Sequence, residues 1–388
     1  MNKKIFIIVL LFILLICLTI VSVSFIPEGI KRSEGNPPED FFQYYVQSVR
    51  LINGEKIYQS SALHNKIRED IGWEFEDVSP ANPPFFVLFS LPFSLLPYPL
   101  AWWSLIIFSV LVIFFTSFAV SKNCGYKPTL SVCFGIAALC TFPTAVLLIL
   151  NHIESVLLLV LVAGWIFFKK GKNASGAIMW GVAASIKLFP ALYLVPLINH
   201  RYRKIGNISI AVALFATALG GAIIGWDQTI VYFFEIIPSS RSFYSSYGNF
   251  SVLAAGTVMN SAVLGWGLEI FIGTFLFITL LWNPGSIDKI FVTATAGSLL
   301  LSPLSWSYYF IIIPPVLIVF SGYLSLNQFQ DRLLIYFLIL TTLFWPSFFG
   351  GWTKEMFQFF PKGIGKLLTC VPTGGLLFLF FMGLNRVK

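Results

Sequence analysis

Apolar segments of about 20 residues recur along the whole chain and are separated by short polar connections. A helix of this length can cross the hydrocarbon core of a bilayer. The pattern predicts an all-α polytopic membrane protein, a bundle of about 10–12 transmembrane helices that forms a single domain over residues 1–388. The expected crossings are 5–25, 100–120, 129–149, 154–168, 207–225, 264–283, 289–304, 306–322, 333–349 and 364–384.

Two apolar segments do not fit a simple crossing. Residues 83–99 contain five prolines, and proline removes a helix hydrogen-bond donor, so we expect a short helix at the outer interface. Residues 173–199 join two basic connections that must share one side of the membrane. They must therefore enter partway and return, turning near 185–190. Irregular backbone at that depth needs surrounding protein or a water-filled cavity, which predicts a cavity on the outer side.

Basic residues set the expected orientation. Lys and Arg mark the cytoplasmic connections of membrane proteins. They cluster here as Lys122 and Lys127; Lys169, Lys170 and Lys172; Arg201, Arg203 and Lys204; and Arg386 and Lys388. We therefore predict a multi-pass protein of the plasma membrane with a cytoplasmic N-terminus. The loop 26–82, with ten acidic and six basic residues, is placed outside. The first apolar run lacks an A-x-A cleavage site and is interpreted as an uncleaved anchor.

Composition narrows the functional classes. Only 11% of the residues are charged, against about 25% in soluble proteins, so no sizeable soluble domain is expected. The net charge of +8 resides mainly in short connections, which argues against nucleic acid as a partner. Five cysteines without a CxxC spacing indicate neither a metal site nor a disulfide framework. We expect no cofactor, and the need for a divalent metal stays open.

Charges inside apolar segments are functional candidates. Lys187 lies at the expected turn of the re-entrant segment. It could meet a phosphate or carboxylate in the cavity, or simply extend its ammonium group to the interface. Glu269 could equally be functional or pair with another buried group.

Polar clusters occur at the predicted outer ends of several spans. His152 and Glu154, in LNHIES, could position a hydroxyl or a phosphate, or form an ordinary polar loop. They are too few for a metal site, which usually has three or four ligands. Asp40, about fifteen residues beyond the first span, could serve as a general base if a partly apolar cleft raises its pKa. On its own, an acidic loop residue is commonly just solvated.

Two further outer segments carry polar and aromatic side chains. Arg241 and Asn249 lie in SSRSFYSSYGNFSVL, where the guanidinium group suits a phosphate or is only solvated. Trp306 and Tyr308 lie in SPLSWSYY. Aromatic residues there either anchor the protein at the interface or stack on sugar rings.

Several stretches together resemble glycosyltransferase family 87. Asp40, Tyr44 and Tyr45 in DFFQYYVQSVRLINGEKIY are similar to the family's first-loop pattern. Lys187 and Pro190 match in WGVAASIKLFPALYLVPLINHRYRK. Further similar segments are ANPPFFVLFSLPFSLLPYPLAWW, GNFSVLAAG and LLSPLSWSYYFIIIPP. Their common order and spacing make the resemblance more specific than any one of them.

The sequence departs from the family pattern at several positions. Asn82 stands where a tyrosine is usual. His152 and Glu154 replace amide residues, and Tyr308 and Tyr309 replace a histidine pair. These changes bear on the identity of the acceptor and of the sugar.

The resemblance, over about residues 40–315, implies a GT-C hexosyltransferase of the cell envelope. Such an enzyme would move a hexose, mannose in the family's best-known case, from a polyprenyl-phosphate donor to a lipid or glycan acceptor outside the membrane. Its partners would be these substrates and membrane lipids. Asp40 would be the general base. The donor-phosphate or substrate contacts would be Lys187, Arg241, Asn249, His152, Glu154, Tyr44, Tyr45, Trp306 and Tyr308.

Two other functions remain alternatives. A transporter or flippase of lipid-linked glycans often shows internal repeats with paired broken helices, whereas the two broken segments here are dissimilar. A non-catalytic scaffold would give the acidic outer loop no special role.

Overall fold

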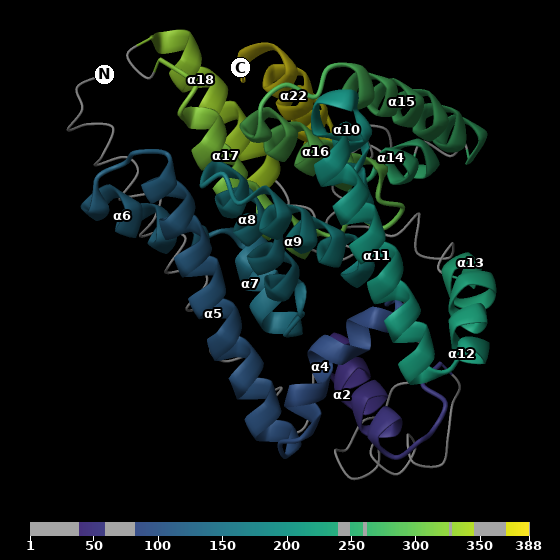
Figure 1. Cartoon of the computed structure of the whole chain (residues 1–388). Helices are drawn as coiled ribbons and strands as arrows, with labels where there is room; N and C mark the ends of the chain where they lie inside the picture. The colour runs from purple at the N-terminus through teal and green to yellow at the C-terminus, as the bar shows by residue number, and fades with distance from the viewer. Residues whose placement is uncertain are drawn as a thin grey trace.

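A computed structural model gives the structure of residues 39–58, 82–239, 249–258, 262–325, 328–344 and 370–387. Over these ranges the chain forms a bundle of helices (Figure 1), and its strand-like pairing is one isolated bridge between Asn249 and Trp306. The expected all-α membrane fold is confirmed. The predicted crossing 5–25 lies outside the described residues.

Long apolar helices account for the clearest predicted crossings. Within the described ranges, three helices are long and apolar enough to cross a membrane: α5 (Tyr98–Asn123), the helix His200–Ile224 that combines η3 (His200–Tyr202) with α11 (Arg203–Ile224), and Val263–Trp282 within α15 (Ala262–Trp282). Helices α6 (Pro128–Leu139) and α7 (Phe142–Leu150) are bent by 56° and together form a fourth candidate. Pro143 at the start of α7 fits this break, because proline lacks the donor that a continuous helix needs.

The remaining predicted crossings coincide with shorter helices. They are α8 (Glu154–Lys169), α16 (Ile287–Leu301), η6 (Ser307–Ile312) with α17 (Ile313–Ser321), α18 (Phe329–Ile339) with η7 (Leu340–Phe344), and α22 (Val371–Arg386). A helix of 15 residues spans only about 22 Å, less than the hydrocarbon thickness of about 30 Å. Every residue of α16 from Asp288 to Leu300 is buried. Such a helix is apolar because protein surrounds it, so composition alone does not distinguish it from a lipid-facing span.

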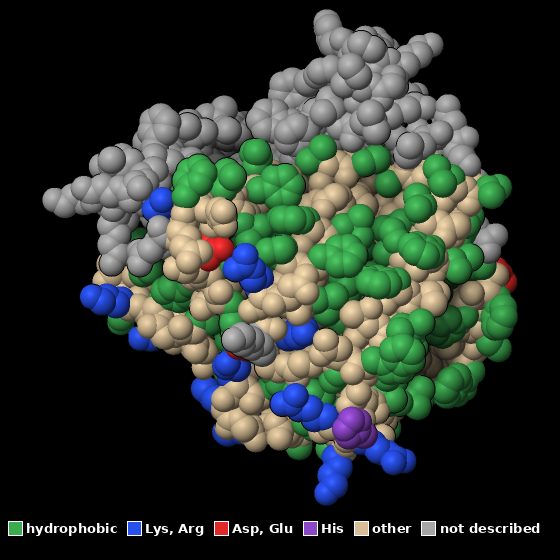
Figure 2. Space-filling view, turned by 90° about the horizontal axis from the view of Figure 1, so that it is seen from above, with side chains coloured by type: hydrophobic (Ala, Val, Ile, Leu, Met, Phe, Trp, Pro, Cys, Tyr) green, Lys and Arg blue, Asp and Glu red, His purple; other side chains and the backbone are tan. Residues whose placement is uncertain are grey.

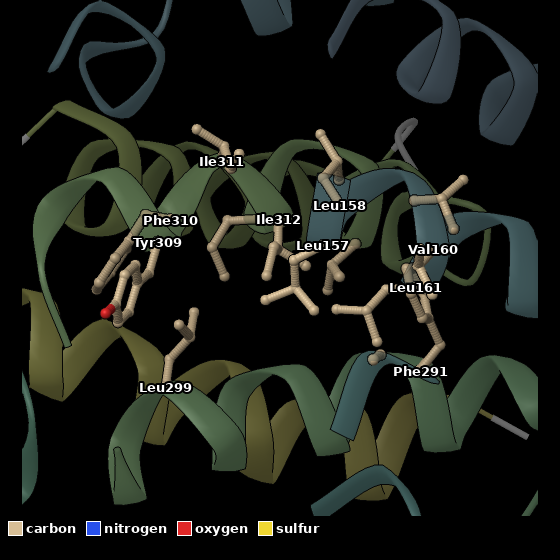
Figure 3. Close-up of a cluster of buried hydrophobic side chains, with 14 of the residues drawn as sticks. Leu157, Leu158, Val160, Leu161, Phe291, Leu299, Tyr309, Phe310, Ile311 and Ile312 are labelled. Atoms are coloured by element: carbon tan, nitrogen blue, oxygen red, sulfur yellow. The ribbon is translucent and has the colours of Figure 1, made fainter. Parts of the chain in front are cut away.

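A tightly packed apolar core lies between α8, α16 and η6. Figure 3 shows Leu157 and Leu161 of α8 close to Ile312 of η6, with Phe291 and Leu299 of α16 below them. All five side chains are at most 1% exposed. This core joins the helices whose ends carry the polar residues described below.

The expected re-entrant segment is present. Helix α9 (Asn173–Ile186) ends at Lys187, whose backbone is extended (φ −142°, ψ 151°). Pro190, in η2 (Phe189–Tyr193), cannot donate to the carbonyl of residue 186, so the α-helix cannot continue past this point. The chain then returns alongside α9. The return is evident from Tyr193, whose ring centre lies 5.0 Å from that of Trp180 in the middle of α9. The short α10 (Val195–Ile198) completes the return.

One end of the bundle is joined by a buried carboxylate. Asp288 of α16 accepts hydrogen bonds from Trp165 Nε1 (2.9 Å), Lys169 Nζ (2.8 Å) and Tyr323 Oη (2.6 Å). Two further links at this end are the hydrogen bonds Tyr126–Ser321 (2.9 Å) and Tyr202–Gly285 (2.8 Å). The basic connections near Lys127, Lys169 and Arg201, which the sequence assigns to the cytoplasmic side, therefore lie at the same end of the bundle.

Basic side chains mark this same end. Figure 2 looks onto the end of the bundle that holds α10, α18 and the C-terminus, and Lys and Arg side chains gather along one side of it. The exposed basic residues include Lys122, Lys127, Lys169, Lys170, Lys172, Arg201, Arg203 and Lys204. We refer to this region as the basic end.

The opposite end is formed by α2 (Glu39–Ile52), η1 (Pro84–Phe86), α4 (Val87–Ser94) and α12 (Trp226–Val231) (Figure 1). Helix α2 packs against α4 through the hydrogen bond between Ser48 and Ser90 (2.6 Å). The short helix expected from the prolines of residues 83–99 is present as η1 and α4, and the last two residues of this segment begin α5. Its position at the outer interface stays a prediction. Because α8 rises by about 1.5 Å per residue, its first residue lies about 22 Å from Lys169. That distance separates the site described next from the basic end.

The contact of α11 with η1 makes a test of the packing at this end. A Cβ added at Gly220 of α11 would lie 2.6 Å from the backbone nitrogen of Phe85. Since backbone must shift to relieve this, we expect Gly220→Ala to reduce stability by about 1–3 kcal/mol. Thermal unfolding in detergent, followed by size-exclusion chromatography, measures the loss.

Gly267→Ala is the matched control, because a Cβ at this helical glycine of α15 meets nothing within 4 Å. Its melting temperature should be unchanged or raised, since alanine favours a helix over glycine. Equal melting temperatures for the two variants would contradict the close contact at Gly220.

Candidate active site

A tight connection between α7 and α8 positions the first site residues. Asn151 ends α7 in the left-handed conformation (φ 49°), which asparagine tolerates better than most residues. Its Nδ2 donates to the carbonyl of Trp102 (2.9 Å) and so fixes the connection on α5. The turn places His152 and Glu154 side by side at the start of α8.

A buried ion pair forms the centre of the site. The side chain of Glu154 is fully buried, and its carboxylate contacts both Lys187 Nζ and His152 Nδ1. Lys187, with a side chain 10% exposed, also donates to Tyr309 Oη (2.9 Å). Its ammonium lies 4.4 Å from the centre of the Tyr309 ring, a favourable cation–π position. The starts of α8 and η6 and the end of α9 therefore meet at one buried cation.

The contacts of His152 indicate which ring nitrogen carries its hydrogen. A carboxylate only accepts hydrogen bonds, so Nδ1 is the donor to Glu154. Burial, and then the charge of Lys187, lower the pKa of His152 well below its ordinary value, so the ring is neutral. Its Nε2 then accepts from the hydroxyl of Tyr44, which it contacts. Tyr308 stacks on the same ring, with centres 4.2 Å apart.

Asp40 belongs to the same end of the molecule. It is half-buried in the first turn of α2, one helical turn before Tyr44. Burial first, and then the negative charge of Asp40, raise the pKa of Tyr44 well above its ordinary value. The carboxylate is thus within electrostatic range of the Tyr44–His152 contact. Side chains i and i+4 share a helix face, which directs Asp40 and Tyr44 to the same side of α2.

Some residues predicted to bind substrate have other partners. Tyr45 donates to the carbonyl of Leu96 (3.0 Å), in the connection between α4 and α5. Asn249 donates to Pro303 O (2.8 Å) and accepts from the backbone nitrogen of Ser305 (2.8 Å). Its amide therefore ties two chain segments together and positions the turn that leads into η6.

The other candidates are placed as follows. Trp306 is half-buried and is paired through its backbone with Asn249. Arg241 lies outside the described residues. Glu269, on α15, is hydrogen-bonded to the backbone of Leu253.

Sequence reasoning missed two members of the site. Tyr309 was noted as an aromatic residue of the outer turn and as a departure from the family pattern, but not as a predicted site residue, yet it binds Lys187 directly. Asn82, noted in the same way, hydrogen-bonds to the side chain of Tyr44. The sequence did offer an indication for each residue. Tyr309 follows Trp306 and Tyr308 in SWSYY, and Asn82 lies in ANPP at the start of the proline-rich segment.

The arrangement suits chemistry on an anionic substrate. It combines a buried cation, a half-buried carboxylate and several aromatic faces. Among the described residues, no group of three or more His, Cys, Asp or Glu side chains is arranged to hold a metal ion. The expectation that no cofactor is needed stays a prediction.

The ion pair makes a direct prediction about stability. Lys187→Met would leave the carboxylate of Glu154 buried without its cation, which typically costs about 3–5 kcal/mol. The double variant Lys187→Met/Glu154→Gln removes both charges, and its glutamine oxygen can still accept from His152. Thermal unfolding should therefore show a large loss for the single variant and a partial recovery for the double variant. Equal stability of Lys187→Met and the unmodified protein would mean that the ammonium group is solvated.

The comparison with protein families bears on this site. The model of glycosyltransferase family 87 matches residues 81–303, more than half of the chain. This stretch includes the ion pair and His152, while Asp40 and Tyr309 lie beyond its two ends. A comparison with the curated proteins finds no match. The suspected relationship is confirmed, and the chain belongs to glycosyltransferase family 87.

Proposed function

We propose that this site transfers a hexose, with mannose as the first candidate, from a polyprenyl-phosphate donor to a lipid or glycan acceptor. The observation that carries the proposal is Lys187, a cation buried where the re-entrant helix breaks. It lies in a chain of contacts that reaches Tyr44 of α2, the helix that also carries Asp40 one turn earlier. Family membership supports glycosyl transfer in general. The buried cation and the apolar side chains around it support a lipid-linked phosphate as the donor.

The donor requires a cation for its phosphate and an apolar surface for its chain. Glu154 and Tyr309 occupy two of the three N–H donors of Lys187 among the described residues, which leaves one for a phosphate oxygen. Large apolar side chains stay exposed on the helices next to this end, where a polyprenyl chain can lie within the bilayer. They include Leu214, Phe215, Leu219 and Ile223 of α11, and Trp226 and Ile230 of α12.

In the proposed reaction, Asp40 accepts the proton of the acceptor hydroxyl. The acceptor oxygen then forms a bond to the anomeric carbon, while the bond from this carbon to the phosphate oxygen breaks. The electron pair leaves with the polyprenyl phosphate, whose added negative charge is stabilised by Lys187. Attack opposite the leaving group would invert the anomeric centre. Positioned proton transfer typically contributes about 10²–10⁴-fold to such a rate.

The different polarity of the two ends of α8 supports an assignment of the site to one side of the membrane. Basic residues concentrate in cytoplasmic connections, and here they lie at the end opposite to Glu154 and Lys187. This supports an extracytoplasmic site and a cytoplasmic N-terminus in the plasma membrane. A lipid-linked donor suits such a site, because the sugar is carried on a lipid rather than on a soluble nucleotide.

The test is sugar transfer by purified protein in nanodiscs with a panel of radiolabelled polyprenyl-phosphate hexoses. We expect turnover with one donor and a loss of about 10²–10⁴-fold in Asp40→Asn, which cannot accept a proton. Donor binding should be largely kept, because the phosphate contact is elsewhere.

Asp227→Asn is the control. Asp227 is an exposed carboxylate that pairs with Lys56 (3.1 Å), and the hydrogen bond from Lys56 lowers its pKa. Water and salt screen exposed ion pairs, so they contribute little to stability, and this variant should keep full turnover. Undiminished transfer by Asp40→Asn would refute the assigned base, and binding without turnover across the panel would favour a transporter of lipid-linked glycans.

A further inference from the structure

The charges of the site are already balanced before any ligand enters. Lys187 carries one positive charge, Glu154 one negative charge, and His152 is neutral. The Glu154 and His152 side chains are at most 3% exposed, so water screens these charges poorly. A phosphate bound at Lys187 therefore adds a negative charge beside the carboxylate that already uses this cation.

An uncompensated buried charge is costly, and a buried site commonly restores neutrality by taking up a proton. The groups facing His152 are Glu154 of α8, Lys187 after α9, Tyr44 of α2, and Tyr308 and Tyr309 of η6. A phenol can lose a proton but does not become a cation at physiological pH, so the three tyrosines cannot offset the added negative charge. The imidazole of His152 and the carboxylate of Glu154 are in contact and both can accept a proton. The imidazole is the more basic of the two.

We propose that binding of a phosphate ester at Lys187 is coupled to the uptake of one proton by the His152–Glu154 pair. This inference rests on the proposed function only in taking Lys187 as the phosphate contact. It assigns to these two residues a role separate from the base, Asp40. They adjust the charge of the site to that of its ligand.

The sign of the effect follows from the causes of the low His152 pKa. Burial and the charge of Lys187 lower this pKa in the empty site. A bound anion offsets the charge of Lys187, so the pKa of His152 rises on binding. By linkage, affinity then increases as the pH falls between the bound and the free pKa values, by up to about tenfold per pH unit. Above the bound pKa the affinity becomes independent of pH.

Protonation also changes the contact with α2. A charged imidazole donates from both nitrogens, so Nε2 can no longer accept from the hydroxyl of Tyr44. The hydroxyl must turn and accept instead, on the same helix face as Asp40. Phosphate binding would thereby be transmitted to the helix that carries the base.

Isothermal titration calorimetry tests this coupling without requiring sugar transfer. The probe is farnesyl methyl phosphate, a phosphodiester that keeps a single negative charge from about pH 5.5 to about pH 8.5, unlike a monoester, whose second pKa is about 6. Titrations in buffers of different ionisation enthalpy give the number of protons taken up. We expect about one proton per ligand within the linkage window, and affinity that increases at lower pH.

Matched histidine variants identify the group. His152→Gln should bind the probe with no proton uptake and with affinity independent of pH. His200→Gln, at an exposed histidine of η3 near the basic end, should behave as the unmodified protein does. If His152→Gln does not fold, Glu154→Gln serves instead. It should abolish the uptake and bind the probe more tightly near about pH 8, because no carboxylate competes for Lys187.

Three results would overturn the inference. Binding without proton uptake would refute the coupling and leave the proposed transfer reaction intact. Uptake that persists in His152→Gln or Glu154→Gln would assign the proton to another group. An absence of binding would refute the phosphate contact at Lys187, whereas failure of the transfer reaction alone would appear only in the radiolabelled assay.

Discussion

The buried ion pair between Glu154 and Lys187 is the interaction on which the rest of this end of the molecule depends. Neither charge is stable in a low-dielectric interior without the other. Helix α8 must therefore begin, and helix α9 must end, where the two side chains can meet. Tyr309 then joins η6 to the cation, and His152 joins α2 to the carboxylate. Two opposite charges thus hold together α2, the α8–α9 pair and η6, which lie in three separate parts of the sequence.

Two polar clusters of different kinds lie at the two ends of α8. At the basic end, Asp288 is satisfied by Trp165, Lys169 and Tyr323, and exposed Lys and Arg side chains surround it. At the other end the cation is buried and the carboxylate of Asp40 is only half-buried. A closed network of this first kind stabilises helix ends. A buried cation near a partly accessible carboxylate can instead exchange a partner for a ligand.

Much of this could be predicted from the sequence, for identifiable reasons. A lysine in an apolar run that must turn back is costly unless it is paired, so Lys187 was found from the pattern alone. Its partners were not, because the contacts of Lys187 with Glu154 and Tyr309 depend on how three helices pack. That Asn249 binds substrate stays a prediction, and what the sequence did not indicate is that its amide holds two chain segments together. Helices such as α16 were interpreted as crossings, because burial in protein and exposure to lipid select the same residues.

We expect a phosphate-linked sugar to bind between Lys187 and Asp40. The most direct test is a cryo-electron microscopy structure in a nanodisc with a non-transferable analogue, a polyprenyl phosphonate joined to the sugar through carbon. Phosphonate density should lie in hydrogen-bond contact with Lys187 Nζ, and the sugar should lie on the Asp40 side of the phosphonate. Phosphonate density beside Lys169 or Arg201 at the basic end, with the Glu154–Lys187 pair undisturbed and empty of ligand, would contradict this expectation.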